Sequence, residues 1–193
     1  MKVNIYIKII YHGKGYNENG NIIYELKSGN GKVLEYNYDG ELIFEGEYLN
    51  GKRNGKGKEY EHGELIFEGE YLNGKRNGKG KEYYKDGNLI FEGEYLNNKR
   101  WKGKGKEYDY NSLIFEGEYL NGKRNGKGKE YYKNGKLKFE GEYLYDYKIK
   151  GKLYYINGKV EYEGEFRYDR KWNGKGYDES GNIIYELING NEK

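Results

Sequence analysis

The chain has 193 residues, and its 35 Lys and Arg against 32 Asp and Glu leave a net charge of +3 with both signs interspersed. This balance argues against a general polyanion binder, so no nucleic-acid partner is expected. The absence of Cys excludes disulfides and Cys-ligated metal sites, and no apolar run approaches the roughly 20 residues of a membrane span, so cytoplasmic residence is expected. Aromatic residues make up 18% of the chain, which favours a thin folded core of rings over disorder.

One unit of 23 or 24 residues recurs along the chain, and no helical period accounts for it. The copies that begin at Leu42, Leu65 and Leu113 are almost identical, whereas those from Leu89 and Leu137 diverge more. This periodicity predicts an all-β fold, an elongated single-sheet solenoid of tandem antiparallel β-hairpins. The aromatic residues that lead the copies are Phe44, Phe67, Phe91, Phe115, Phe139, Tyr162 and Tyr185.

The two ends of the chain carry imperfect copies that resemble caps. Residues 13–16 (GKGY) match residues 174–177, and the spacing from Tyr24 to Phe44 shrinks to 20, as though that copy had lost part of its loop. A second molecule could pair with the terminal edge strands, so homo-oligomers are a possible consequence. We predict one solenoid domain over residues 1–193, with degenerate copies and a cap in 1–43, regular repeats in 44–161, and a final copy and cap in 162–193.

Within one copy, alternation of side chains predicts a β-strand followed by a returning strand. Leu42, Phe44, Gly46 and Tyr48 share one face, and the other face is mostly charged. The missing side chain of Gly46 leaves room for a neighbouring ring to lie against the backbone.

Residue pairs that contain Gly are expected to form the turns of each copy. The returning strand is expected over residues 55–60, with Asn50-Gly51 and Asn54-Gly55 supplying the positive φ angles of the hairpin loop. A turn into the next copy is expected at His62-Gly63, where other copies have Asp-Gly or Asn-Gly.

The run Phe-Glu-Gly-Glu-Tyr, then Asn-Gly-Lys, Gly-Lys-Gly and a turn Gly, resembles the MORN (membrane occupation and recognition nexus) repeat from Gly13 to Leu187. The chain departs from the family in having Tyr, as at Tyr48, where Trp is frequent, and in lacking Glu-Gly-Glu in its first copy. The resemblance implies a β-hairpin scaffold that binds a protein partner of unknown identity along a groove, or acidic phospholipids. Residues 130–141 also resemble bacterial antitoxin-like repeats, so an antitoxin-like binding role is a further alternative.

No catalytic residue, metal site or cofactor is predicted, because a near-periodic chain repeats the same groups instead of building one unique constellation. His12 and His62 both precede a Gly and are interpreted as turn residues. Glu45 and Glu47 recur in phase and are expected to pair with Lys56 and Lys58 on the adjacent strand. The Gly-rich segment 51–57 lacks the spacing and the Ser or Thr of a phosphate loop. The chain is therefore not expected to be an enzyme.

The first candidate binding surface is the row of aromatic side chains. Core packing is the usual role of such rings, but a single layer of hairpins would leave part of the row beside a groove. The predicted partner-binding residues are Phe44, Tyr48, Phe67, Tyr71, Phe91, Tyr95, Phe115, Tyr119, Phe139 and Tyr143.

The second candidate surface is a basic loop edge, because Lys-Arg pairs fall at equivalent positions in four copies. Such an edge would either be a solvated rim or face an anionic membrane surface. The residues predicted to contact lipid in that alternative are Lys52, Arg53, Lys75, Arg76, Lys99, Arg100, Lys123 and Arg124.

Overall fold

The computed structural model describes residues 13–16 and 19–193, which form β-strands and turns with no helix. The predicted all-β class is confirmed. The chain divides into two compact units, Met1–Arg100 and Trp101–Lys193. The interpretation of His12 as a turn residue lies outside the described residues.

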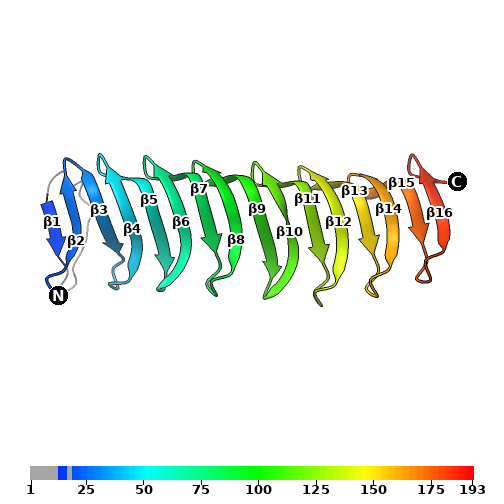
Figure 1. Ribbon diagram of the computed structural model, residues 1–193, viewed down its shortest axis with the longest axis horizontal. Coiled ribbons are helices and arrows are strands. Elements are labelled where there is room, and N and C mark those ends of the chain that lie inside the picture. The colour runs from blue at the N-terminus through cyan, green and yellow to red at the C-terminus, as the bar shows by residue number, and fades with distance from the viewer. Residues whose placement is uncertain (1–12, 17–18) are drawn as a thin grey trace. The chain divides into compact units, whose positions relative to one another are not determined.

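The first unit consists of hairpins in which each strand runs antiparallel to the next, as the alternating arrows of Figure 1 show. The predicted tandem hairpins are therefore present. The strands are β1 (Gly13–Tyr16), β2 (Ile22–Lys27), β3 (Asn30–Tyr36), β4 (Leu42–Leu49), β5 (Lys52–Glu61), β6 (Glu64–Leu72), β7 (Lys75–Tyr83) and β8 (Leu89–Leu96).

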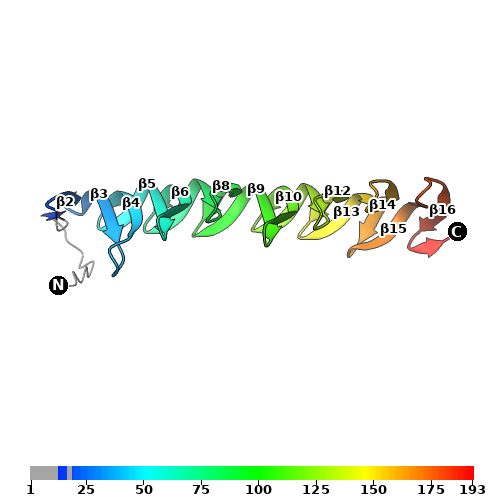
Figure 2. The ribbon, with the colours of Figure 1, turned by 90° about the horizontal axis from the view of Figure 1, so that it is seen from below.

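The second unit repeats this arrangement, again with antiparallel neighbours, and its hairpins are curved (Figure 2). The diverged copy that starts at Leu137 also forms an antiparallel hairpin, but its register shifts between Glu142 and Tyr143, whereas the regular copy shifts between Gly46 and Tyr48. The strands are β9 (Lys99–Asp109), β10 (Ser112–Leu120), β11 (Lys123–Tyr131), β12 (Leu137–Leu144), β13 (Tyr147–Tyr154), β14 (Val160–Arg167), β15 (Arg170–Tyr177), β16 (Ile183–Ile188) and β17 (Asn191–Glu192).

The hairpin turn is shorter than predicted. Asn50 and Gly51, with φ of 53° and 74°, close it in two residues, so β5 begins at Lys52 and not at Gly55. Gly55 does have a positive φ of 87°, but it lies inside the strand, where the register with β4 shifts between Gly46 and Tyr48. The second Asn-Gly pair is therefore part of a β-bulge, not of the loop.

The first copy is also shortened differently from the prediction. Its two-residue turn at Ser28 and Gly29 is intact, whereas β2 has six residues and β3 seven. This copy is therefore shorter in its two strands and not in its turn. The turn predicted at His62-Gly63 is confirmed, with φ of 52° and 84°.

A row of glycines crosses the strands beneath the aromatic rings. Gly57 of β5 is paired with Gly46 on one side and with Gly69 on the other. A Cβ atom added at Gly46 would lie 2.6 Å from Cζ of Phe44 and 2.7 Å from Cα of Gly57. The predicted packing role of Gly46 is confirmed, because only a glycine lets the ring lie on the backbone.

The core of each unit is built by rings from consecutive copies. Phe67 meets Tyr71 of its own copy at a centroid distance of 5.7 Å and Tyr95 of the next at 5.0 Å, both edge to face. Such pairs are worth about 0.5 to 1.5 kcal/mol beyond the apolar area that they bury. One copy cannot complete this core by itself, so consecutive copies stabilise one another.

Candidate binding surfaces

The predicted aromatic surface is the core of the protein. The five phenylalanines of the row are 0% exposed, and its tyrosines are 2–9% exposed. Partner contact by these ten rings stays a prediction, and a ligand could reach the phenylalanines only by opening the repeat. The sequence placed the rings on one face, but it did not show what covers that face.

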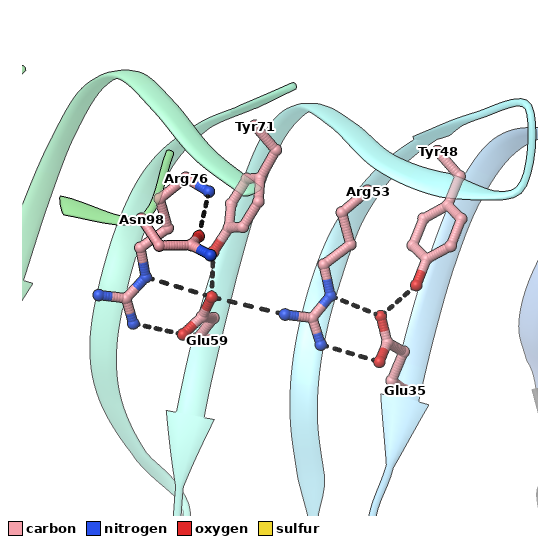
Figure 3. Close-up of polar contacts among 7 residues, drawn as sticks. All are labelled: Glu35, Tyr48, Arg53, Glu59, Tyr71, Arg76 and Asn98. Atoms are coloured by element: carbon pink, nitrogen blue, oxygen red, sulfur yellow. Dashed lines mark hydrogen bonds and ion pairs between the residues drawn. The ribbon is translucent and has the colours of Figure 1, made fainter. Parts of the chain in front are cut away.

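Arginines and glutamates alternate in a ladder along the first unit (Figure 3). Arg53 donates two hydrogen bonds of 2.9 Å to the buried carboxylate of Glu35 in the preceding copy, and a third, of 3.4 Å, to Glu59 on its own strand. Arg76 binds Glu59 in turn through both carboxylate oxygens. The tyrosine hydroxyls of Tyr48 and Tyr71 donate to the same two carboxylates.

Each guanidinium also lies over a phenylalanine. The Cζ atom of Arg53 is 4.0 Å from the centroid of Phe44, and that of Arg76 is 4.1 Å from the centroid of Phe67. Burial opposes ionisation of Glu59, but the hydrogen bonds from Arg76 and Tyr71 outweigh it and hold its pKa below the usual range. The ladder is therefore a layer of paired charges that covers the aromatic core.

The second unit has the same ladder. Arg124 binds Glu107 at 2.9 and 2.7 Å, reaches Glu130 at 3.1 Å, and stacks 4.0 Å from the centroid of Phe115. In the next copy Lys148 takes the place of arginine and binds Glu130 at 2.8 Å.

The arginines predicted to contact lipid thus have a structural role in the ladder, and their contact with lipid stays a prediction. Their side chains are 18–28% exposed, and their charges are neutralised by carboxylates. The register explains their direction, since Arg53 pairs with the inward Tyr48 in the strand ladder. The acidic members were not singled out from the sequence, although Glu59, Glu82 and Glu130 of the Lys-Glu-Tyr segment recur almost in phase with the arginines.

The opposite face of the hairpins carries the predicted rows of Glu and Lys. Glu45 pairs in register with Lys58, and the carboxylate lies 3.4 Å from the ammonium, which confirms this part of the prediction. Glu47 bends toward the bulge instead and accepts the backbone N–H of Lys56 at 3.2 Å. These exposed pairs are charge-balanced and contribute little net attraction for a ligand.

A row of leucines and lysines lies at the hairpin-turn end of this outer face. Leu49 pairs in register with Lys52, and Leu72 with Lys75, so each pair projects from the same side of the sheet. The leucines are 44–51% exposed. Within the described residues no ion pair joins the three lysines. We call this set the leucine–lysine row, and its members are Leu49, Lys52, Leu72, Lys75, Leu96 and Lys99.

The sequence contained a signal for this row. Leu49 shares its parity with Glu45 and Glu47, so it is an apolar residue on the polar face. The row does not continue in the same form in the second unit. There Lys123 approaches Asp146 at 3.8 Å, and Tyr147 stands opposite Leu144 where a lysine would be expected.

No group of three or more His, Asp or Glu side chains is arranged to hold a metal ion in the part of the chain that the structure describes. No helix there is long and apolar enough to cross a membrane.

Antiparallel hairpins repeated every 23 or 24 residues, with glycine rows beneath shared rings, define a tandem β-hairpin repeat protein. Three stretches of the chain, residues 44–60, 67–89 and 115–136, match the MORN repeat family. The chain is a MORN repeat protein. Repeats of this family commonly serve as scaffolds or membrane-binding modules and are generally non-enzymatic. No curated protein sequence matches the chain closely enough to identify a relative.

Proposed function

We propose that this protein is a non-enzymatic scaffold that binds an acidic segment of a protein partner along the leucine–lysine row. The observation that carries the proposal is the row itself: exposed leucines, each beside a lysine that has no ion-pair partner among the described residues. The rings predicted to bind a partner are buried in the core, and the arginines predicted to contact lipid are paired in the ladder. In the described part of the first unit, the row is a repeated surface on which exposed apolar groups lie beside lysines without ion-pair partners.

The two residue types would contribute in different ways. Complete burial of a leucine side chain is worth roughly 1.5 to 3 kcal/mol, so covering the exposed half of each gives about 1 kcal/mol per copy. The lysines would attract carboxylates and fix the orientation of the segment, with most of their effect on the association rate. Several such copies in sequence support a specific but moderate affinity.

An anionic membrane is the second candidate, and the structure favours it less. Glu47, Glu70 and Glu94 are exposed on the same face, two residues before each leucine of the row. A flat anionic surface would meet these carboxylates together with the lysines, whereas a narrow peptide can follow the row alone. No contact favours an antitoxin-like role over another protein partner.

The test uses a displayed peptide library rich in Asp, Glu and Leu, and the full chain as bait. The variant Lys52→Glu/Lys75→Glu/Lys99→Glu reverses the row, and Lys123→Glu is the control, since Lys123 occupies the same position but faces Asp146. We expect the wild type and the control to enrich the same acidic peptides and the triple variant to lose them, with unchanged circular dichroism.

Vesicles that contain phosphatidylserine are assayed in parallel by sedimentation. If the library yields no peptide that depends on the three lysines, the proposal is wrong. If the vesicles bind the wild type and not the triple variant while no peptide does, the membrane role replaces it.

A further inference from the structure

The partner conformation follows from the spacing of the row, and this inference rests on the proposed function. We propose that the leucine–lysine row binds an acidic segment in the polyproline II conformation, with an apolar residue at every third position and carboxylates between.

The turns of the first unit are joined copy to copy, which fixes the spacing of the row. Gly74 of one turn donates its backbone N–H to the carbonyl of Arg53 in the previous copy at 2.8 Å, and Asn98 donates to Arg76 at 3.0 Å. Asn73 also donates its N–H to the side chain of Asn54 at 3.3 Å. Successive leucines are therefore held two strands apart, and two strands span about 9.4 to 9.8 Å.

Among regular backbones, polyproline II matches this distance best. It has three residues per turn and rises about 3.1 Å per residue, so one side of the helix recurs every 9.3 Å or so. A β-strand presents the same side about every 6.7 Å and can match only every second leucine or fewer. An α-helix gives about 10.5 Å for seven residues, and its error grows to roughly 2 Å over the three leucines.

The hydrogen-bonding groups at this edge support the same choice. Both backbone donors of the turn at Asn73 and Gly74 are already used by the preceding copy. A partner strand would find no free donors there for β-augmentation. A polyproline II segment has no such requirement, because its backbone makes no internal hydrogen bonds and stays solvated.

The charge of the row indicates which residues lie between the apolar positions of the partner segment. Lys52 and Lys75 lie beside Leu49 and Leu72, on the adjacent strand of each hairpin. A segment with three residues per turn places its remaining side chains on either side of the leucine contact, where a carboxylate can reach a lysine. The occupant is thus an acidic, proline-rich segment with period three.

The experiment measures binding of fluorescent peptides to the full chain by anisotropy. The probe is Leu-Pro-Glu repeated four times, and its control is an isomer of the same composition with irregularly spaced leucines. A helical peptide with leucine at every seventh position and a strand-forming peptide with alternating Leu and Glu complete the set. We expect the period-three peptide to bind at least tenfold more tightly than the others.

Two matched variants locate the binding. Leu72→Ser removes a member of the row, and Leu144→Ser removes an equally exposed leucine at the same position of the second unit. We expect Leu72→Ser to weaken the period-three peptide at least fivefold and Leu144→Ser to leave it unchanged.

Each other outcome is decisive. If the isomer, helix or strand peptide binds as tightly and is weakened by Leu72→Ser, the polyproline II inference is wrong and the acidic-segment function stands. If no peptide is affected by Leu72→Ser or by reversal of the row lysines, both proposals fail.

Discussion

The glycine row makes a specific demand on Gly69, and replacing it by alanine tests how the core is built. An added Cβ would lie 2.7 Å from Cα of Gly80, 2.7 Å from the carbonyl oxygen of Lys79 and 2.7 Å from Cζ of Phe67. Two of these neighbours are backbone atoms of the paired strand and cannot retreat without disturbing the ladder. Overpacking costs about 1 to 3 kcal/mol, and this clash belongs at the upper end.

Part of that cost is recovered in the unfolded chain. Alanine lowers the conformational entropy of the unfolded chain, which raises the free energy of unfolding by about 0.4 to 1 kcal/mol. We therefore expect Gly69→Ala to lower the free energy of unfolding by about 2 kcal/mol or more, measured from urea titrations followed by circular dichroism.

Gly63→Ala is the matched control. Gly63 has a φ of 84°, but an added Cβ would meet no atom within 4 Å. Its left-handed backbone costs alanine about 1 to 2 kcal/mol, and the same entropic gain reduces the net loss to about 1 kcal/mol. A Gly69→Ala protein that is no less stable than Gly63→Ala would refute the account of rings lying on a bare backbone.

Three further predictions concern the polar ladder and the tyrosines. Arg76→Met should lower the free energy of unfolding by about 2 kcal/mol or more, because Glu59 loses its bidentate partner. Adding Glu59→Gln should recover part of this loss. Simple additivity of the two substitutions in a double-mutant cycle would contradict the coupling. The pKa values of Glu59 and Glu82 are lowered because hydrogen bonds from arginine and tyrosine outweigh burial. Their contribution to stability is therefore complete above the unfolded pKa of about 4.3, and it is lost as the pH falls through the lower pKa of the folded state. Urea midpoints between about pH 5 and 2 should show this decline, and it should be shallower in Glu59→Gln. Burial and the hydrogen bond to Glu45 raise the pKa of Tyr60 to about 12, so stability should be complete below about pH 10 and decline as pH rises toward 12. Tyrosinate absorbance should follow that decline, and full ionisation of the native protein near pH 10 would contradict it.

The sequence predicted the fold because local and periodic signals agree in every copy. Alternation gave the strands, and Asn50-Gly51 supplied the two residues that a tight hairpin turn requires. The bulge at Gly55 was missed because an Asn-Gly pair is a turn signal in any local analysis. Whether such a pair closes a loop or interrupts a ladder depends on the register with the other strand.

The candidate site was less predictable because parity assigns a side chain to a face but does not say what covers it. Phe44 was correctly placed on the aromatic face, yet its burial depends on Arg53 of its own hairpin and Tyr71 of the next copy. Arg53 in turn depends on Glu35, which lies 18 residues earlier in the chain. These contacts join copies, and a pattern within one copy cannot show them.

The same dependence explains why residues that usually form binding surfaces belong to the core and its cover here. Tyr and Arg are common at interface hot spots because they combine apolar area with polar groups. Among the described residues the buried aliphatic side chains are Leu26 and Val33, so this protein uses mainly aromatic and arginine side chains to build its core and to cover it. Glu59 shows the consequence, since its carboxylate binds Arg53, Tyr71 and Arg76 and has little capacity left for a ligand. The proposed function therefore assigns recognition to residues that the core does not need, which are an exposed leucine and a neighbouring lysine in each of the three copies that form the leucine–lysine row. A ligand of such a row is selected less by any one contact than by whether its own period agrees with that of the hairpins.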